Sequence, residues 1–92
     1  MKVTLSINGY LNQFFKQSEF ELELDEGATL ADLFAAVDKR FGESLPRSVW
    51  SREKKAFRGP VSVSVESKKI KDMALALKEG QQVSVSRFLV GG

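Results

Sequence analysis

The 92-residue sequence contains no cysteine and no histidine. Without cysteine it has no disulfide and no thiolate nucleophile, and without either residue type it lacks the usual ligands of a zinc site. The imidazole that most often serves as a general acid or base is missing as well. Because so few catalytic groups remain, we expect a protein that is not an enzyme by itself and that binds no metal.

Long apolar runs and a large excess of one charge are also missing. No stretch approaches the roughly 20 residues that span a membrane, and Met1-Lys2 leads into alternating residues instead of a signal-peptide core. We therefore expect a cytoplasmic protein without membrane contact. Lys and Arg number 14 against 12 Asp and Glu, which gives little reason to expect a nucleic-acid partner, although the pI is near 9.0.

The length of the chain predicts a single domain, residues 1–92. Its first quarter predicts two half-buried strands. Apolar residues alternate with polar ones in two stretches: Val3, Leu5 and Ile7 in residues 2–7, and Phe20, Leu22 and Leu24 in residues 18–25. Glu19, Glu21 and Glu23, which alternate with Phe20, Leu22 and Leu24, predict a solvated face. Residues 9–17 are expected to form a hairpin loop in which Phe14 and Phe15 fold back on the sheet or stand exposed.

Thr29 begins a helical pattern. Thr29 and Asp32 form the acidic variant of a capping box, and Lys39 and Arg40 stand in the last turn, where they complement the helix dipole. The apolar residues follow at helical spacing: Leu30, Leu33, Phe34, Val37 and Phe41. We expect this stripe to pack on the sheet and Gly42 to end the helix as its C′ residue.

Residues 43–59 are irregular and carry a basic run from Arg47 to Arg58, together with Trp50 and Phe57. Basic and aromatic residues side by side can bind nucleic acid. The alternative is a solvated connection in which Trp50 and Phe57 cover the open end of the core, and the lack of an RNA-binding module signature favours it. The run could also be a surface on which a partner docks.

The last third predicts further strands. Valines alternate with serines in residues 61–65, Ile70 lies in a short strand, residues 72–78 are predicted to form one helical turn, and Gln82 to Phe88 form the final strand. A hairpin, a helix and then more strands predict an α+β fold in which one main helix lies across a mixed sheet of four to five strands.

The sequence ends in Gly91-Gly92. Without a Cβ atom, two glycines can enter a channel too narrow for other residues, and their conformational freedom disfavours order. We therefore expect a flexible, protruding tail over about residues 87–92. Such an end is a frayed terminus, a purification or truncation scar, or an acyl group that is handed into the active site of another protein.

Four stretches, taken in this order, carry a resemblance to a known family: Leu24 to Leu30 with Asp32-Leu33, Val61 to Val65, Leu77 to Val83, and Gly91-Gly92. The chain resembles the MoaD/ThiS-type sulfur carriers of the ubiquitin-like β-grasp fold, and its length suits the MoaD-like members better. Two features depart from the family pattern. Glu66-Ser67-Lys68 stands where an Asn-Gly turn is common, and Phe88-Leu89-Val90 is bulkier than the common molybdopterin-type ending.

The resemblance implies a function for Gly92. An E1-like adenylating enzyme that uses ATP and Mg²⁺ would activate its carboxylate, and a sulfur donor, a sulfurtransferase, would displace AMP to leave a thiocarboxylate. Gly91 would let the backbone thread the active site of the partner. Arg87, Phe88, Leu89 and Val90 would pair with or pack against that partner, while Phe88 and Val90 could equally pack on their own sheet. The chain itself would bind no cofactor.

The resemblance leaves several pathways open. We expect a small subunit of molybdopterin synthase type, which gives its sulfur to a pterin precursor held by a larger synthase subunit. Thiamine-thiazole synthesis and tungsten-cofactor assembly would use the same chemistry. The alternatives of another kind are a ubiquitin-like modifier joined through Gly92 to lysines and a non-catalytic β-grasp binding module.

Overall fold

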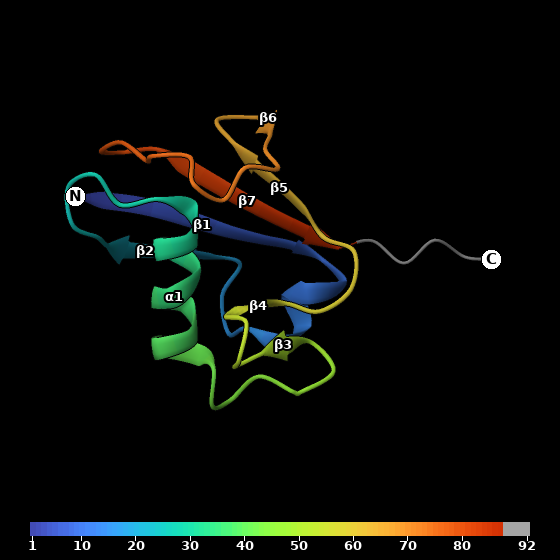
Figure 1. Ribbon diagram of the computed structural model, residues 1–92. Helices are drawn as coiled ribbons and strands as arrows, with labels where there is room; N and C mark the ends of the chain where they lie inside the picture. Colours follow the sequence, from blue (N-terminus) through green and yellow to red (C-terminus); the bar gives the residue numbers. More distant parts are fainter. Residues whose placement is uncertain (88–92) are drawn as a thin grey trace.

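Alternation of apolar and polar residues produces a sheet on which an α-helix lies (Figure 1). The computed structural model describes residues 1–87. Its elements in chain order are β1 (Lys2–Gly9), the 3-10 helix η1 (Tyr10–Phe14), β2 (Glu19–Glu23), α1 (Leu30–Phe41), β3 (Trp50–Ser51), β4 (Ala56–Phe57), β5 (Ser62–Val65), β6 (Lys68–Lys69) and β7 (Gln82–Arg87).

The main sheet has the strand order β2-β1-β7-β5-β6. β1 and β7, the first and last strands, pair in parallel near its centre, and the remaining neighbours pair antiparallel. The predicted α+β class, with one helix and a mixed sheet, is confirmed. Because β1 and β7 run in the same direction, the end of β7 lies at the opposite end of the sheet from Met1 (Figure 1).

The two faces of the sheet differ because successive strand residues point to opposite sides. One face is apolar and buried beneath α1; it includes Val3, Leu5, Ile7, Phe20, Leu22, Val63, Val65, Val83 and Val85. The other face is rich in hydroxyl groups, since Ser6, Ser84 and Ser64 are in register across three strands. On β2 the three glutamates are exposed, as the sequence predicts.

Every one of the first four backbone N–H groups of α1 has a partner. The predicted capping box is present: the Thr29 N–H donates to Asp32 Oδ2 at 2.9 Å, and the Asp32 N–H donates to Thr29 Oγ1 at 3.3 Å. The Leu30 and Ala31 N–H groups donate to the Leu75 and Met73 carbonyls at 3.0 and 2.9 Å, and Leu33 N–H donates to the Thr29 carbonyl. This satisfies donors that a helix leaves free at its N-terminus.

These bonds explain why the helical turn predicted for residues 72–78 is wrong. Apart from a turn at residues 73 and 74, the segment is not regular helix, and Ala76 forms an isolated antiparallel bridge with Thr29. Met73, Leu75 and Leu77 are half-buried or buried, whereas Ala74 and Ala76 between them are exposed. The segment therefore follows a period of two, because its carbonyls are used to cap α1.

Gly42 ends α1, but not in the way the sequence predicts. Its φ of −54° and ψ of −37° are right-handed, so it is not the left-handed C′ residue that was expected. Glycine is required here because the neighbouring atoms leave no room for a side chain. A Cβ atom at this position would lie 2.5 Å from the Asp38 carbonyl oxygen and 2.7 Å from both Arg52 Nε and Asp38 Oδ1.

We predict that Gly42→Ala destabilises the protein, although alanine ordinarily stabilises helical backbone by about 1 kcal/mol over glycine. Overpacking of this kind costs about 1–3 kcal/mol, so the free energy of unfolding in urea should fall. The loss should be smaller when Arg52→Ala has already removed one of the three crowding atoms. An unchanged or higher stability in Gly42→Ala would contradict the packing described here.

Two loops contain more structure than the sequence predicts. Residues 10–14 form η1, after which Phe15 is buried against Phe20 and Phe41. Residues 50–57 contain the β3–β4 hairpin, in which Trp50 pairs with Phe57. These two rings are 1% and 8% exposed, which confirms that they cover the core and leaves neither free to stack on a nucleic-acid base.

Candidate functional site

The candidate site begins where β7 ends. In the register of the sheet, Ser86 lies opposite Asn8 of β1 and Ser62 of β5, and Arg87 lies opposite Gly9. The last described residue is therefore the end of a strand paired on both sides (Figure 1). Phe88, Leu89, Val90, Gly91 and Gly92, to which the sequence assigns partner binding and activation, lie outside the described residues, so that assignment stays a prediction.

Arg87, which the sequence places at the start of the tail, is held in β7 by contacts with two loops. Its guanidinium carbon lies 5.4 Å from the centroid of the Tyr10 ring, in cation–π geometry. Its Nη1 donates a hydrogen bond to the Arg58 carbonyl oxygen at 3.1 Å. The guanidinium also lies close over Gly59, where a Cβ atom would be 3.1 Å from it. These contacts fix the base from which residues 88–92 continue.

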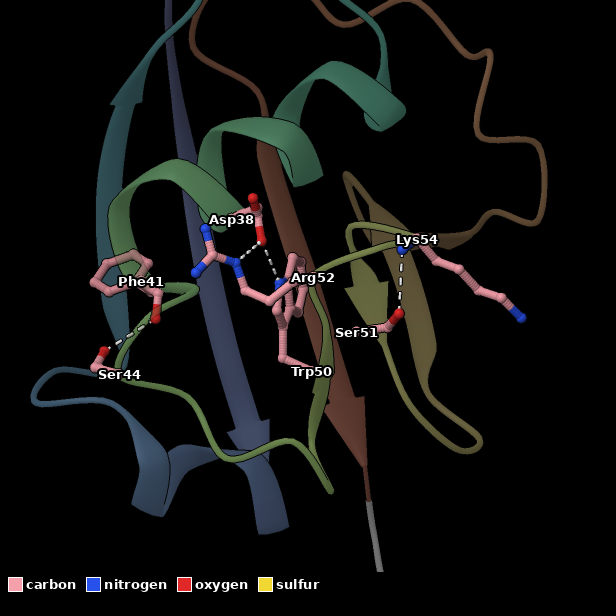
Figure 2. A network of polar contacts seen from close by, with 7 residues as sticks. All are labelled: Asp38, Phe41, Ser44, Trp50, Ser51, Arg52 and Lys54. Carbon is pink, nitrogen blue, oxygen red and sulfur yellow. Dashed lines mark hydrogen bonds and ion pairs between the residues drawn. The ribbon is translucent and has the colours of Figure 1, made fainter.

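A second polar centre joins α1 to the β3–β4 hairpin (Figure 2). Asp38 Oδ1 accepts hydrogen bonds from Trp50 Nε1 and from Arg52 Nε, both at 2.8 Å. Ser51 Oγ accepts from the Lys54 N–H at 3.1 Å and so closes the turn of the hairpin. Asp38 is 8% exposed, and its two donors supply the partners that a buried carboxylate needs.

Asp38 was not predicted to be a site residue, although the sequence contains a signal for it. Asp38 falls on the apolar stripe of the helix, four residues after Phe34 and three before Phe41. A carboxylate on that stripe is expected to be buried and hydrogen-bonded. The sequence gives no indication that Trp50 and Arg52 are the donors, because they lie 12 and 14 residues further along the chain.

The hydrogen bond from the Trp50 N–H lowers the pKa of Asp38 below its ordinary value of 3.8, and the Arg52 guanidinium adds to this shift, while burial opposes it. Hydrogen bonds to the ionised carboxylate stabilise it and so lower its pKa. The folded protein therefore binds this proton less tightly than the unfolded chain. The contribution of Asp38 to stability is complete above its unfolded pKa and is lost as the pH falls through the lower, native pKa.

We expect the free energy of unfolding to fall more steeply below pH 3.8 in the wild-type protein than in Asp38→Asn, which has no proton to gain at this position. Trp50→Phe should raise the native pKa of Asp38, since it removes the first donor. Urea unfolding across this pH range and carboxyl NMR titration measure the two effects. Equal pH profiles for wild type and Asp38→Asn would contradict the assignment.

Among residues 1–87, no group of three or more Asp, Glu, His or Cys side chains is arranged to hold a metal ion. None of the helices in that part combines the length and the apolar character that crossing a membrane requires.

A mixed sheet that packs on one helix, with its last strand beside and parallel to its first, defines the ubiquitin-like β-grasp class. The structure is similar to those of small archaeal modifier protein 1 from H. volcanii (TM-score 0.76, 12% identity, 96% of this chain and 98% of that one) and a putative molybdopterin converting factor subunit 1 from Pyrococcus furiosus (0.68, 24%, 96% and 98%). It is also similar to a chain in the complex of subunits 1 and 2 of molybdopterin-converting factor from Helicobacter pylori (0.66, 20%, 100% and 100%).

These likenesses confirm the expected β-grasp fold and the resemblance to MoaD-like proteins at the level of the fold. The sequence itself matches no family model and no curated protein. With identities below 25%, the similarity establishes the fold.

Proposed function

We propose that this protein is a sulfur carrier whose C-terminal Gly92 is adenylated and then converted to a thiocarboxylate. It serves in the cytoplasm as the small subunit of a molybdopterin synthase. The single observation that carries the proposal is the combination of a β-grasp fold with a Gly91-Gly92 pair whose second glycine is five residues beyond Arg87, the last residue of β7. Five extended residues reach roughly 17 Å, far enough to enter the active site of another protein.

The rigid base of the tail supports this function. β7 is paired with β1 and β5, and the Arg87 guanidinium is held by Tyr10 and the Arg58 carbonyl. The residue that precedes residues 88–92 is therefore already ordered before a partner binds them. Binding then costs less conformational entropy than it would if the end of β7 were not held in place. Backbone hydrogen bonds to an extended tail supply affinity without a demand on the side chains.

The chemistry requires activation by a second protein. A carboxylate is ionised near neutral pH and is a poor acyl donor. In the proposed sequence, a Gly92 oxygen attacks the α-phosphate of ATP, whose charge Mg²⁺ neutralises, and pyrophosphate leaves. Sulfur at the oxidation level of sulfide, supplied by a sulfurtransferase, then attacks the Gly92 carbonyl carbon, AMP leaves, and a thiocarboxylate remains. This chain contributes the acyl group and no catalytic side chain, so it is a substrate of the activating enzyme and not an enzyme alone.

The larger synthase subunit is the proposed acceptor partner. The H. pylori structure is a complex of subunits 1 and 2 of molybdopterin-converting factor, and its similar chain covers this one over its whole length. We propose an equivalent partner here, which takes the loaded tail and passes the sulfur to a pterin precursor. Sulfur delivery to a thiamine-type thiazole would use the same loaded tail and a different acceptor.

A protein modifier is the second candidate, favoured by the similarity to small archaeal modifier protein 1. In this case a lysine amine would attack the carbonyl carbon of adenylated Gly92, release AMP and form an isopeptide bond. Incubation of the protein with the E1-like enzyme of its host, ATP and sulfide distinguishes the two. The carrier gives a C-terminal thiocarboxylate detectable by mass spectrometry. Isopeptide conjugates without thiocarboxylate would indicate the modifier, and no activation would overturn both.

A further inference from the structure

A groove lies between the β3–β4 hairpin, α1 and the β5–β6 end of the sheet. Its volume is about 410 Å³. Its lining includes the buried rings of Phe34 and Phe57 and the half-buried side chains of Ile70 and Met73. The core therefore reaches the surface at this place, and it is bordered by the hairpin that Asp38 holds against α1 (Figure 2).

Two other hollows and one face of the sheet in the described part are rich in polar residues. One hollow is lined by residues 23–28 and Asp32, and another by Glu19, Glu21 and Arg40 with their neighbours. The face of the sheet opposite α1 carries the serine rows of β1, β7 and β5. A partner that contributes apolar side chains would find complementary surface in the groove and not at these places.

The groove is also bordered by positive charge. Lys69 and Lys71 are exposed and belong to its lining. Two ion pairs occur among residues 1–87, Met1 with Glu23 and Arg52 with Asp38, so neither lysine is neutralised there. Residues 45–71 contain eight basic side chains and two acidic ones; the basic ones are Arg47, Arg52, Lys54, Lys55, Arg58, Lys68, Lys69 and Lys71, and the acidic ones are Glu53 and Glu66.

We propose that this groove docks a segment of a partner protein in which apolar side chains are flanked by carboxylates. The apolar side chains fill the space beside Phe57 and Met73, and the carboxylates approach Lys69 and Lys71. Complementary charge at the rim accelerates encounter and selects against basic partners. The inference goes beyond the carrier function, because this contact requires neither Gly92 nor its activation.

The test uses the full chain to select from a display library of random short peptides. We expect enriched peptides to contain apolar residues flanked by Asp or Glu. Their affinity, measured by calorimetry, should fall about tenfold in the double variant K69E/K71E and at least as far in Met73→Lys. K16E/K39E, which makes the same change of net charge at exposed residues outside the groove lining, should leave the affinity unchanged. Removal of residues 88–92 should also leave it unchanged, which separates this site from the tail.

Several results would overturn the proposal. It fails if no peptide is enriched, if the enriched peptides lack acidic residues, or if K69E/K71E weakens binding no more than K16E/K39E. A rise in affinity on removal of residues 88–92 would mean that the chain fills its own groove. A dimer in solution that Met73→Lys dissociates would assign the groove to a second copy, and RNA binding abolished by K69E/K71E without peptide binding would assign it to nucleic acid.

Discussion

Adding one residue after Gly92 is expected to abolish activation of the protein while leaving it folded. The reacting carboxylate would move by one residue, roughly 3.5 Å, and a reacting group displaced by 1 Å already loses about 100-fold in rate. Gly91→Val should have a comparable effect, because a β-branched side chain does not fit a channel built for glycine. ATP–pyrophosphate exchange catalysed by the E1-like enzyme of the host measures the loss.

The controls separate loss of activation from loss of the fold. Thermal unfolding of both variants should match that of the wild type, since the changes follow β7 in the sequence. An extension that a protease removes, to regenerate Gly92, should restore exchange to the wild-type rate. If the extended chain were activated as fast as the wild type, Gly92 could not be the acyl donor.

Trp50→Ala is expected to destabilise the protein by about 4 kcal/mol, the largest effect of a single core substitution predicted here. Trp50 is 1% exposed and packs edge-to-face on Phe57, with the ring centroids 4.9 Å apart. Its loss leaves a cavity between α1 and the β3–β4 hairpin and removes one donor from Asp38. Because domains of this size are stable by about 5–15 kcal/mol, much of the stability would be lost.

Trp50→Phe is the matched control. It retains most of the ring and deletes the N–H group, so its destabilisation should be clearly smaller than that of Trp50→Ala and should come from the hydrogen bond to Asp38. Urea unfolding followed by circular dichroism measures both variants. Similar losses in the two variants would mean that packing of the ring contributes little, contrary to the buried position of Trp50.

Much of the fold could be predicted because its signals are local. The alternating apolar residues of β1, β2 and β5 and the helical stripe of α1 each lie within one short stretch. The helical turn predicted for residues 72–78 was wrong because Met73-Ala74-Leu75-Ala76-Leu77 is apolar at every position. Neither a helical nor a strand period can be recognised in such a stretch. The bonds from Leu30 and Ala31 decide its structure, and they come from residues more than 40 positions earlier.

The candidate site was predicted less completely. Gly91 and Gly92 were assigned through resemblance to a family, and their assignment stays a prediction. The contacts of Arg87 with Tyr10 and the Arg58 carbonyl could not be foreseen, since they depend on the parallel pairing of β1 with β7 and on the path of residues 58–61. Residues far apart in sequence come into contact only once the strands have paired. The local pattern of apolar and polar residues does not determine which strands pair with each other.

If Gly92 carries sulfur, the intact mass of the protein isolated from its own host will show it. Purification under gentle, non-reducing conditions should yield a species in which one C-terminal oxygen is replaced by sulfur. Fragmentation should place that change at Gly92, and the one-residue extension should lack it. An unmodified mass, which persists after incubation with the E1-like enzyme of the host, ATP and sulfide, would contradict the claim.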